Sequence, residues 1–88
     1  MPGIALVGID VAGGVQLGLQ VPWFKVNGSP AVVVGDRIAP HGEPPHSPMP
    51  TMVQGTSTFR LGGIATCRAG HLASCGHPTT GRPFFRIP

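Results

Sequence analysis

Four side chains of the kinds that bind transition metals gather in two short segments of the chain. His41 and His46 lie in the segment 41–50, and Cys75 and His77 flank a single glycine. Zinc in structural sites takes four nitrogen and sulfur ligands in a tetrahedron, and a closed site of this kind leaves no open position for catalysis. Three histidines and one cysteine are therefore candidate ligands of a structural zinc site, although Cys/His sites also accept iron. The spacings H-x4-H and C-x-H are not specific to metal sites, so a role of the histidines as polar loop residues stays open. The predicted ligands are His41, His46, Cys75 and His77.

Two other residues compete for the ligand positions. His71 stands where an internal repeat, described below, has Asp36 in its first copy. This favours a role in a turn, and His71 also stays open as a ligand in place of His46. Cys67 lies in the strand-like run IATCR, where a small buried hydrophobic residue is the favoured interpretation. A disulfide between Cys67 and Cys75 is the less favoured alternative, because no secretory signal points to an oxidising compartment.

Catalytic chemistry is poorly represented in the sequence. A nucleophilic Cys75 with His77 as its base has no evident orienting carboxylate, and residues so close in a turn rarely bring an imidazole against a thiolate. Asp10, Asp36 and Glu43 are the only carboxylate side chains, which leaves few candidates for acid–base chemistry. No GxxxxGK[ST] phosphate loop is present. The sequence therefore predicts a protein without enzymatic activity.

The composition indicates a small β domain. The 88 residues include 14 Gly and 11 Pro, so scarcely a stretch of helical length lacks a residue that is costly inside a helix. Hydrophobic residues make up 41% of the chain and charged residues only 10%, the reverse of the signature of unfolded chains. We therefore expect a single all-β domain over residues 1–88, with little or no helix.

Short runs rich in β-branched and aromatic residues alternate with turn signals. The predicted strands are 4–7, 15–19, 23–26, 31–34, 51–53, 58–61, 64–67 and 84–87. Asn27-Gly28 and Gly62-Gly63 each follow one of these runs, and both dipeptides accept the positive φ that a tight hairpin requires. The sequence therefore predicts two hairpins closed by these dipeptides. The proline-rich segment 41–50 is predicted to be a loop with a restricted backbone.

An internal repeat relates these strands to one another. Aligning residues 24–36 with residues 59–71 matches Phe24 with Phe59, Lys25 with Arg60, Gly28 with Gly63 and Gly35 with Gly70. The two chain ends supply a third, divided copy, because residues 84–88 resemble the first strand and residues 1–8 resemble residues 29–35. We therefore expect the terminal strands to pair and complete a third hairpin in a pseudo-threefold arrangement.

The charge of the chain argues against a nucleic-acid partner. The formal net charge is +3, but the basic residues are scattered and form no contiguous stripe interleaved with aromatics. They are Lys25, Arg37, Arg60, Arg68, Arg82 and Arg86. The N-terminal segment lacks the basic and apolar regions of a signal peptide, and no apolar run approaches the ~20 residues that span a bilayer. We therefore expect the protein to begin in the cytosol.

Two segments of the chain resemble a known family. VNGSPAVVVGDRIAPHG (26–42) resembles the recurring segment of PAAR-repeat proteins, in which an Asn-Gly hairpin leads through Pro-Ala to Gly-Asp and then to a His or Cys turn. GGIATCRAGHLASCGHP (62–78) resembles the same segment and ends in the Cys-Gly-His-Pro that family members often show. The resemblance spans essentially the whole chain and implies a small pointed cone of three β-hairpin units. The chain departs from the family motif at Pro30-Ala31-Val32-Val33 and at Gly70-His71, which replaces a second Gly-Asp.

The resemblance also implies a function. PAAR-repeat proteins cap the trimeric valine-glycine repeat spike of type VI secretion systems, and related proteins sit on the spikes of contractile phage tails. This implies a nonenzymatic spike tip, one copy per trimer, assembled in the cytoplasm and carried on a secreted apparatus or virion tail into transient contact with a target membrane. Family members bind zinc near the apex through three histidines and one cysteine, which here implies His41, His46, Cys75 and His77. A stand-alone zinc-binding interaction module is the alternative.

The blunt end of such a cone would offer short strand edges and apolar side chains to the last strands of the spike. Trp23, the Phe84-Phe85 pair and the run Val32–Val34 are candidates for that contact. The same residues are equally suited to the core, and the sequence leaves both interpretations open.

Overall fold

A computed structural model describes residues 2–41 and 49–87 of the chain. Across these residues the protein consists of short strands without a helix, so none of this part crosses a membrane as an apolar helix. The strands are β1 (Gly3–Ile4), β2 (Gln16–Gly18), β3 (Lys25–Val26), β4 (Ser29–Pro30), β5 (Arg37–Ile38), β6 (Thr56–Leu61), β7 (Ile64–Thr66) and β8 (Arg82–Arg86). They form antiparallel pairs, β1 with β8, β2 with β5, β3 with β4 and β6 with β7. The predicted small all-β fold is confirmed.

Both predicted hairpins are present and close as the sequence indicates. Asn27 and Gly28 connect β3 to β4 with φ values of 50° and 84°, and Gly62 and Gly63 connect β6 to β7 with φ values of 59° and 82°. Two central residues with positive φ define a type I′ turn, whose twist matches that of the flanking strands. These dipeptides therefore fix the registers of the two hairpins.

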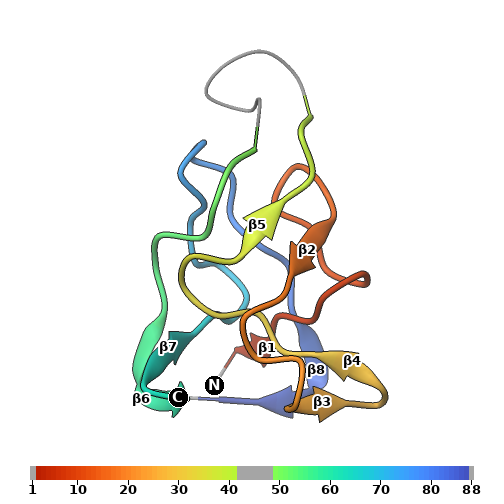
Figure 1. The fold of residues 1–88 in the computed structure, drawn as a ribbon, viewed down its shortest axis with the longest axis vertical. Helices are drawn as coiled ribbons and strands as arrows, with labels where there is room; N and C mark the ends of the chain where they lie inside the picture. The colour runs from red at the N-terminus through yellow and green to blue at the C-terminus, as the bar shows by residue number, and fades with distance from the viewer. Residues whose placement is uncertain (1, 42–48, 88) are drawn as a thin grey trace.

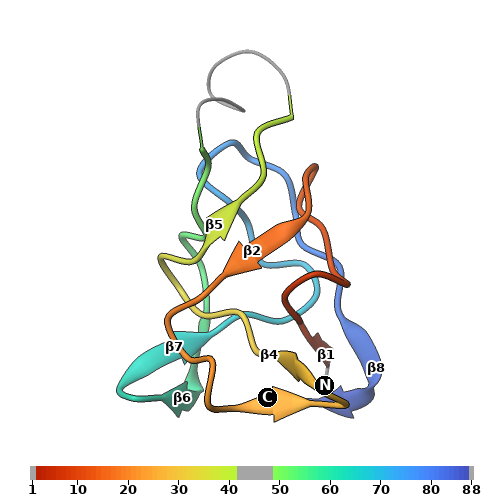
Figure 2. The ribbon, with the colours of Figure 1, turned by 45° about the vertical axis from the view of Figure 1, so that its right-hand side comes forward.

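The terminal strands complete a third hairpin, as the repeat predicts. β1 pairs with β8 so that Gly3 faces Arg86, just as Pro30 faces Lys25 and Ala65 faces Arg60 in the other two hairpins. Beyond β8, the backbone N–H of Ile87 donates to the carbonyl of Pro2 at 3.0 Å. β1 and β8 lie at the same end of the molecule as β3 and β6 (Figures 1 and 2).

A ring of backbone hydrogen bonds joins the three repeats on their common axis. Ala5 N–H donates to Cys67 O at 3.1 Å, Cys67 N–H to Val32 O at 2.9 Å, and Val32 N–H back to Ala5 O at 3.0 Å. All three residues are buried. The ring explains why the predicted strand 31–34 is wrong: its successive residues pair with different neighbours, Ala31 with Leu6 and Val33 with Thr66, in place of one continuous ladder. The predicted strand 51–53 is also wrong, because these residues form only isolated β-bridges, Thr51 with Arg37 and Met52 with Ala73.

The molecule is a cone with a broad end and a narrow end (Figures 1 and 2). Its principal extents are 32 × 23 × 21 Å. The three repeat hairpins lie at the broad end, and the β2–β5 pair lies nearer the narrow end (Figure 1). One apolar cluster includes Ile4, Leu6, Val21, Val26, Ala31, Val33, Leu61 and Ile87, with Phe24, Phe59, Ile64 and Phe85 packed against it. A second cluster includes Ala5, Ala12, Val32, Ile38, Met52, Cys67 and Ala73, with Val7, Val34 and Cys75 packed against it.

Each repeat sends one loop away from the broad end, and similar backbone bonds close the three loops. The donors and acceptors are Ala12 N–H to Gly14 O at 3.0 Å, Ile38 N–H to Pro50 O at 2.9 Å and Ala73 N–H to His77 O at 3.0 Å. The loops differ greatly in length, from one residue inside the closing pair to eleven. The second and third loops carry the predicted metal ligands.

Below these loops, the side chains of Gln16, Met52 and Thr79 meet in the interior. All three are buried, and the Gln16 amide donates to Thr79 Oγ1 at 2.9 Å and to Met52 Sδ at 3.4 Å. The other amide atom, Gln16 Oε1, has no partner among the residues that the structure describes. An unpartnered buried carbonyl destabilises a fold, so this position is one where sequence changes can raise stability.

Candidate metal centre

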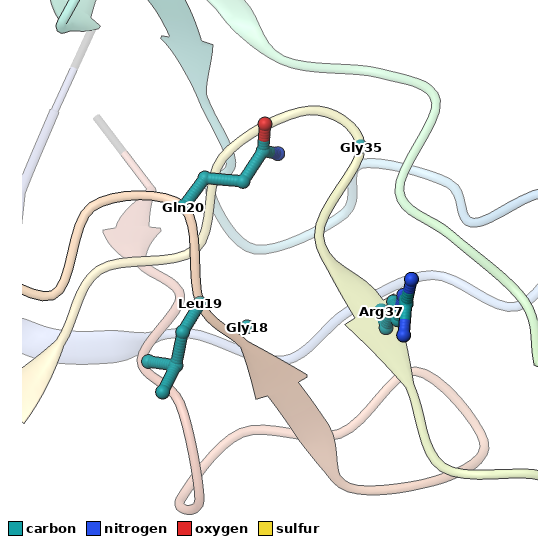
Figure 3. Close-up of a pocket in the computed structure, with 5 residues that line it drawn as sticks. All are labelled: Gly18, Leu19, Gln20, Gly35 and Arg37. Carbon is teal, nitrogen blue, oxygen red and sulfur yellow. The ribbon is translucent and has the colours of Figure 1, made fainter.

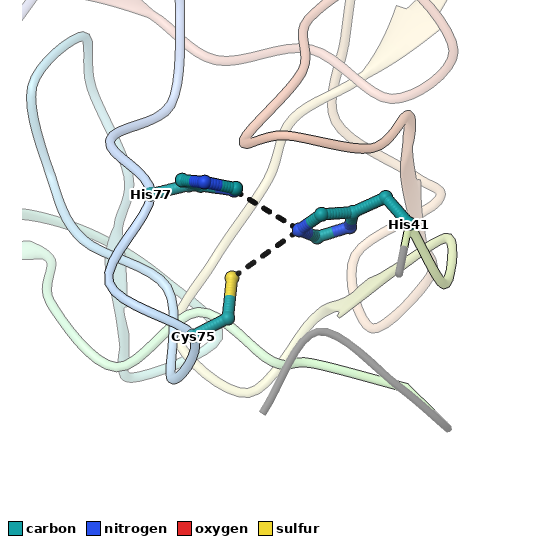
Figure 4. A group of neighbouring side chains, drawn as sticks. All are labelled: His41, Cys75 and His77. Carbon is teal, nitrogen blue, oxygen red and sulfur yellow. Dashed lines mark hydrogen bonds between the residues drawn. The ribbon is translucent and has the colours of Figure 1, made fainter. Parts of the chain in front are cut away.

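Three of the four predicted ligands converge at the narrow end of the cone (Figure 4). His41 Nε2 lies 3.0 Å from His77 Nδ1 and 3.5 Å from Cys75 Sγ. The donor atoms of the three residues all lie within 4.8 Å of one another, and each side chain is half-buried. The two imidazole rings are stacked, with centroids 5.0 Å apart. Two nitrogens and one sulfur thus surround a common point, an arrangement that could hold a metal ion.

The position of His41 is fixed by its own backbone segment. Its Nδ1–H donates to the carbonyl of Ala39 at 2.9 Å. In a neutral imidazole with the proton on Nδ1, Nε2 presents its lone pair, and Nε2 is the atom turned toward Cys75 and His77 (Figure 4). A second hydrogen bond of this kind orients metal-binding histidines in proteins and raises their basicity. Ala39 directly follows β5. The pairing of β5 with β2 therefore fixes the carbonyl that orients the imidazole ring of His41.

Two glycines of the first loop make room for the histidines. Gly13 has a φ of +84°, and a Cβ atom built on it would overlap His77 Nδ1 and lie 2.6 Å from His41 Nε2. A Cβ atom on Gly14 would overlap the Ala39 carbonyl and lie 2.8 Å from His41 Nδ1. Only glycine at these positions lets the backbone pass so close to the imidazoles. The first loop thus supplies no ligand side chain but packs against the candidate ligands of the other two loops.

His46, the fourth predicted ligand, lies outside the described residues. The group formed by His41, Cys75 and His77 supplies three donors, and a tetrahedral ion takes a fourth from another group. His46 is five residues beyond His41 in the same segment, so it stays a prediction.

His71, the alternative to His46, has a different role. Its Nδ1 accepts the backbone N–H of Arg68 at 3.1 Å, in the same way that Asp36 Oδ2 accepts the N–H of Val33 at 2.9 Å. Asp10 Oδ2 makes the equivalent contact with the N–H of Leu6 at 2.8 Å. Burial, and secondarily the charge of Arg68, lower the pKa of His71, which favours the neutral ring that this contact needs. The turn interpretation of His71 is therefore the one that the structure supports.

Cys67 is a buried core residue, as its position in the repeat indicates. It is fully buried, and its thiol donates to the carbonyl of Gln54 at 3.3 Å. Burial, and then the negative charge of Asp36, raise the pKa of Cys67 to about 12, so Cys67 stays a protonated thiol near neutral pH. It does not belong to the group formed by His41, Cys75 and His77. Cys67 and Cys75 are both free thiols, and the disulfide alternative is wrong.

The contact between Cys75 and His41 is also what a thiol–imidazole catalytic pair would make, with His41 in place of the His77 considered from sequence. What distinguishes the arrangement is the third donor, His77, which lies beside the same His41 nitrogen. The carboxylates of Asp10 and Asp36 are buried and accept backbone hydrogens in the turns. Neither belongs to the group around His41.

A separate open depression of about 410 Å³ lies beside the β2–β5 pair and is lined by Gly18, Leu19, Gln20, Gly35 and Arg37 (Figure 3). Gln20 uses its side chain there to bond Val34 O at 2.8 Å and Asp36 Oδ1 at 3.1 Å. Arg37 is then the one charged side chain in the lining. The depression therefore lacks the convergent polar groups of a ligand site.

The sequence indicated His41, Cys75 and His77 as candidate ligands, but it did not indicate the residues that position them. The role of Gly13 and Gly14 in accommodating the imidazoles depends on contacts between distant parts of the chain. The acceptor at Ala39 is a backbone carbonyl, so the residue type at this position gives no indication of its contact with His41.

Comparison of the chain with protein-family models and with curated proteins finds no match.

Proposed function

We propose that this protein is a nonenzymatic, metal-stabilised tip that caps a trimeric β-helical spike, either the valine-glycine repeat spike of a secretion system or the spike of a phage tail. The observation that carries the proposal is the threefold broad end on a single chain. Phe24, Phe59 and Phe85 contact one another there edge-on, with centroid separations of 6.0, 6.2 and 6.3 Å. One chain that caps a trimer must meet three identical subunits, and three equivalent hairpins offer each subunit a similar surface.

The exposed apolar residues support this docking end. Trp23 and Phe84 precede the first and third of these phenylalanines and are 63% and 56% exposed. The run Val32–Val34 belongs to the interior instead, since Val32 and Val33 are fully buried. Of the candidates for spike contact, Trp23 and Phe84 are therefore the most exposed, and Phe85 is half-buried.

Zinc is the ion that we propose for the narrow end. Zinc–nitrogen bonds of about 2.0–2.1 Å and zinc–sulfur bonds of about 2.3 Å in a tetrahedron separate neighbouring donors by about 3.3 to 3.6 Å. The observed separations from His41 Nε2 are 3.0 Å to His77 and 3.5 Å to Cys75, so small shifts would accommodate the ion. His41 would bind through Nε2, His77 through Nδ1 and Cys75 as thiolate, with His46 as the proposed fourth ligand.

The chemistry supplied by such an ion would be structural. It would cross-link the second and third loops, whose ligands His41 and Cys75 are 34 residues apart in sequence. Because a metal that binds only the folded chain stabilises it, the cross-link would oppose local opening of the narrow end. A tip that is driven against a membrane by a contracting sheath requires resistance of this kind.

Binding to a trimeric spike tests the function. The chain should co-purify with a β-helical spike trimer in a ratio of one chain to three spike subunits, measured by native mass spectrometry. Three chains per trimer would contradict a single cap. Tight metal binding with no affinity for any spike trimer would instead favour the stand-alone zinc-binding module.

A further inference from the structure

Three basic side chains occupy equivalent places at the broad end. Lys25, Arg60 and Arg86 each follow one phenylalanine of the aromatic triangle, and all three are exposed. Each is aligned across its hairpin with a residue that carries no charge, respectively Pro30, Ala65 and Gly3. The strands that carry them, β3, β6 and β8, lie together at the broad end (Figures 1 and 2). Each copy of the repeat therefore supplies one phenylalanine to the apolar centre and one basic residue directly after it in sequence.

These charges are not neutralised by the chain itself. Of the carboxylate side chains that the structure describes, Asp10 and Asp36 are 0% and 1% exposed, and Asp10 is already paired with Arg82 at 2.9 Å. The described surface therefore presents no carboxylate side chain to Lys25, Arg60 or Arg86.

The two arginines are also held in similar ways. Arg60 Nε donates to Ser57 O and Arg86 Nε donates to Pro83 O, in both cases three residues back and at 3.2 Å. The bond uses Nε and orients the guanidinium group, whose terminal nitrogens keep their donors for another acceptor. Fixed guanidinium groups of this kind are suited to bidentate binding of carboxylates.

Resting on the function proposed above, we propose that the broad end selects a trimeric partner whose end face carries one carboxylate per subunit around an apolar centre. Each carboxylate would meet one of Lys25, Arg60 and Arg86, and the partner's axis would meet Phe24, Phe59 and Phe85. Complementary charge at the rim of an interface sets partner choice and orientation more than it sets affinity. Three charges distributed about an axis fit a threefold protein face better than a nucleic acid, which favours a continuous basic stripe.

The test uses three versions of one recombinant spike trimer that differ at a single end-facing position, which is Asp, Asn or Lys. The full chain should bind the Asp trimer most tightly and the Asn trimer on the order of tenfold more weakly, since three rim pairs each contribute a factor of a few. Added salt should reduce that preference. The variant Lys25→Glu, Arg60→Glu, Arg86→Glu should reverse the order and prefer the Lys trimer. Arg37→Glu, outside the broad-end hairpins, is the matched charge control and should keep the wild-type order.

The outcomes separate this proposal from the tip function. Equal binding to all three trimers would overturn the carboxylate assignment and leave the tip function standing. Binding to none of them would overturn the tip function itself. Binding to phosphatidylserine vesicles, or self-association, that is lost in the triple variant while the trimers stay unbound would assign the basic residues to another partner and overturn the proposal. Circular dichroism and the metal content of the triple variant report whether it is folded, and Lys25→Gln, Arg60→Gln, Arg86→Gln repeats the test with charge removal alone.

Discussion

The substitution Gly13→Ala tests whether the first loop holds the metal site open for its ligands. The added Cβ atom would overlap His77 Nδ1 and come within 2.6 Å of His41 Nε2, so at least one imidazole must move. Both nitrogens are proposed donors to the same ion. We therefore expect Gly13→Ala to weaken metal binding while the hairpins of the broad end stay folded.

The expected magnitude has two parts that can be separated. Placing alanine at a φ of +84° costs about 1–2 kcal/mol whether or not metal is present. Displacing a ligand should lower metal affinity by at least about 10–100-fold, the effect known for residues that orient metal ligands. At a free metal concentration of about 100 times the wild-type Kd, metal stabilises the wild type by about 2.7 kcal/mol. A 100-fold weaker site would leave only about 0.4 kcal/mol under the same conditions.

Gly28→Ala is the matched control for backbone strain. Gly28 has the same φ of +84°, but a Cβ atom built on it meets nothing within 4 Å. Urea unfolding of the wild type and both variants, with chelator and with buffered zinc, gives the increment due to metal in each protein. Both variants should lose stability in chelator through the strained φ, with any further loss in Gly13→Ala due to the overlap with the imidazoles, and only Gly13→Ala should lose the metal increment. An unchanged metal increment in Gly13→Ala would refute the geometry described for the narrow end.

Three further predictions concern other parts of the chain. In metal-free protein, N-ethylmaleimide should modify Cys75 and not Cys67, because burial raises the pKa of Cys67 to about 12. Zinc should protect Cys75 from this modification. Mass spectrometry that finds Cys67 modified first would contradict the placement of Cys67 in the core. His71→Asp should make the free energy of unfolding less sensitive to acid. Because the pKa of His71 is lowered in the folded protein, the histidine is protonated in the unfolded chain at a higher pH than in the folded one. The stability that the neutral ring contributes is therefore lost as pH falls below about 6.5. Urea unfolding of this variant at about pH 7.5 and pH 5.5 should give a smaller difference than wild type, and a larger one would refute the turn role. Gln16→Met should leave the free energy of unfolding unchanged or raise it by up to about 1 kcal/mol, because it removes the unpartnered Oε1. Gln16→Glu should lower the free energy of unfolding by about 2 kcal/mol or more, because it buries a carboxyl group. Equal losses in both variants would contradict the described burial of Gln16.

The turn chemistry made the hairpins predictable from sequence. Asn27-Gly28 and Gly62-Gly63 specify their type I′ turns locally, and a repeated pattern is enough to pair the terminal strands. The run Val32–Val34 misled because its β-branched residues do favour extended backbone, yet their hydrogen bonds go to two different repeats. Local propensity describes the conformation of a segment but not the partner that satisfies its backbone.

The candidate ligands His41, Cys75 and His77 were predictable for a different reason, since histidine and cysteine carry their chemistry in the residue type. Spacing could not distinguish His71 from His46 as a candidate ligand. The role of His71 became clear only once the turn was built, because its Nδ1 accepts the backbone N–H of Arg68. Gly13 gave no signal because its importance comes from the ring of His77, which lies far away in sequence.

A group of one cysteine and two histidines requires the three loops at the narrow end to differ from one another. Three identical loops around an axis would present ligands in threes, so they could not supply one cysteine together with histidines from two different loops. In this chain the loops share their closing hydrogen bond but not their contents: one contributes Gly13, one His41, and one Cys75 and His77. A fused, divided repeat can thus keep threefold symmetry at the broad end while it builds a mixed nitrogen and sulfur site at the other. A symmetric homotrimer of the same hairpins would keep the first property and lose the second.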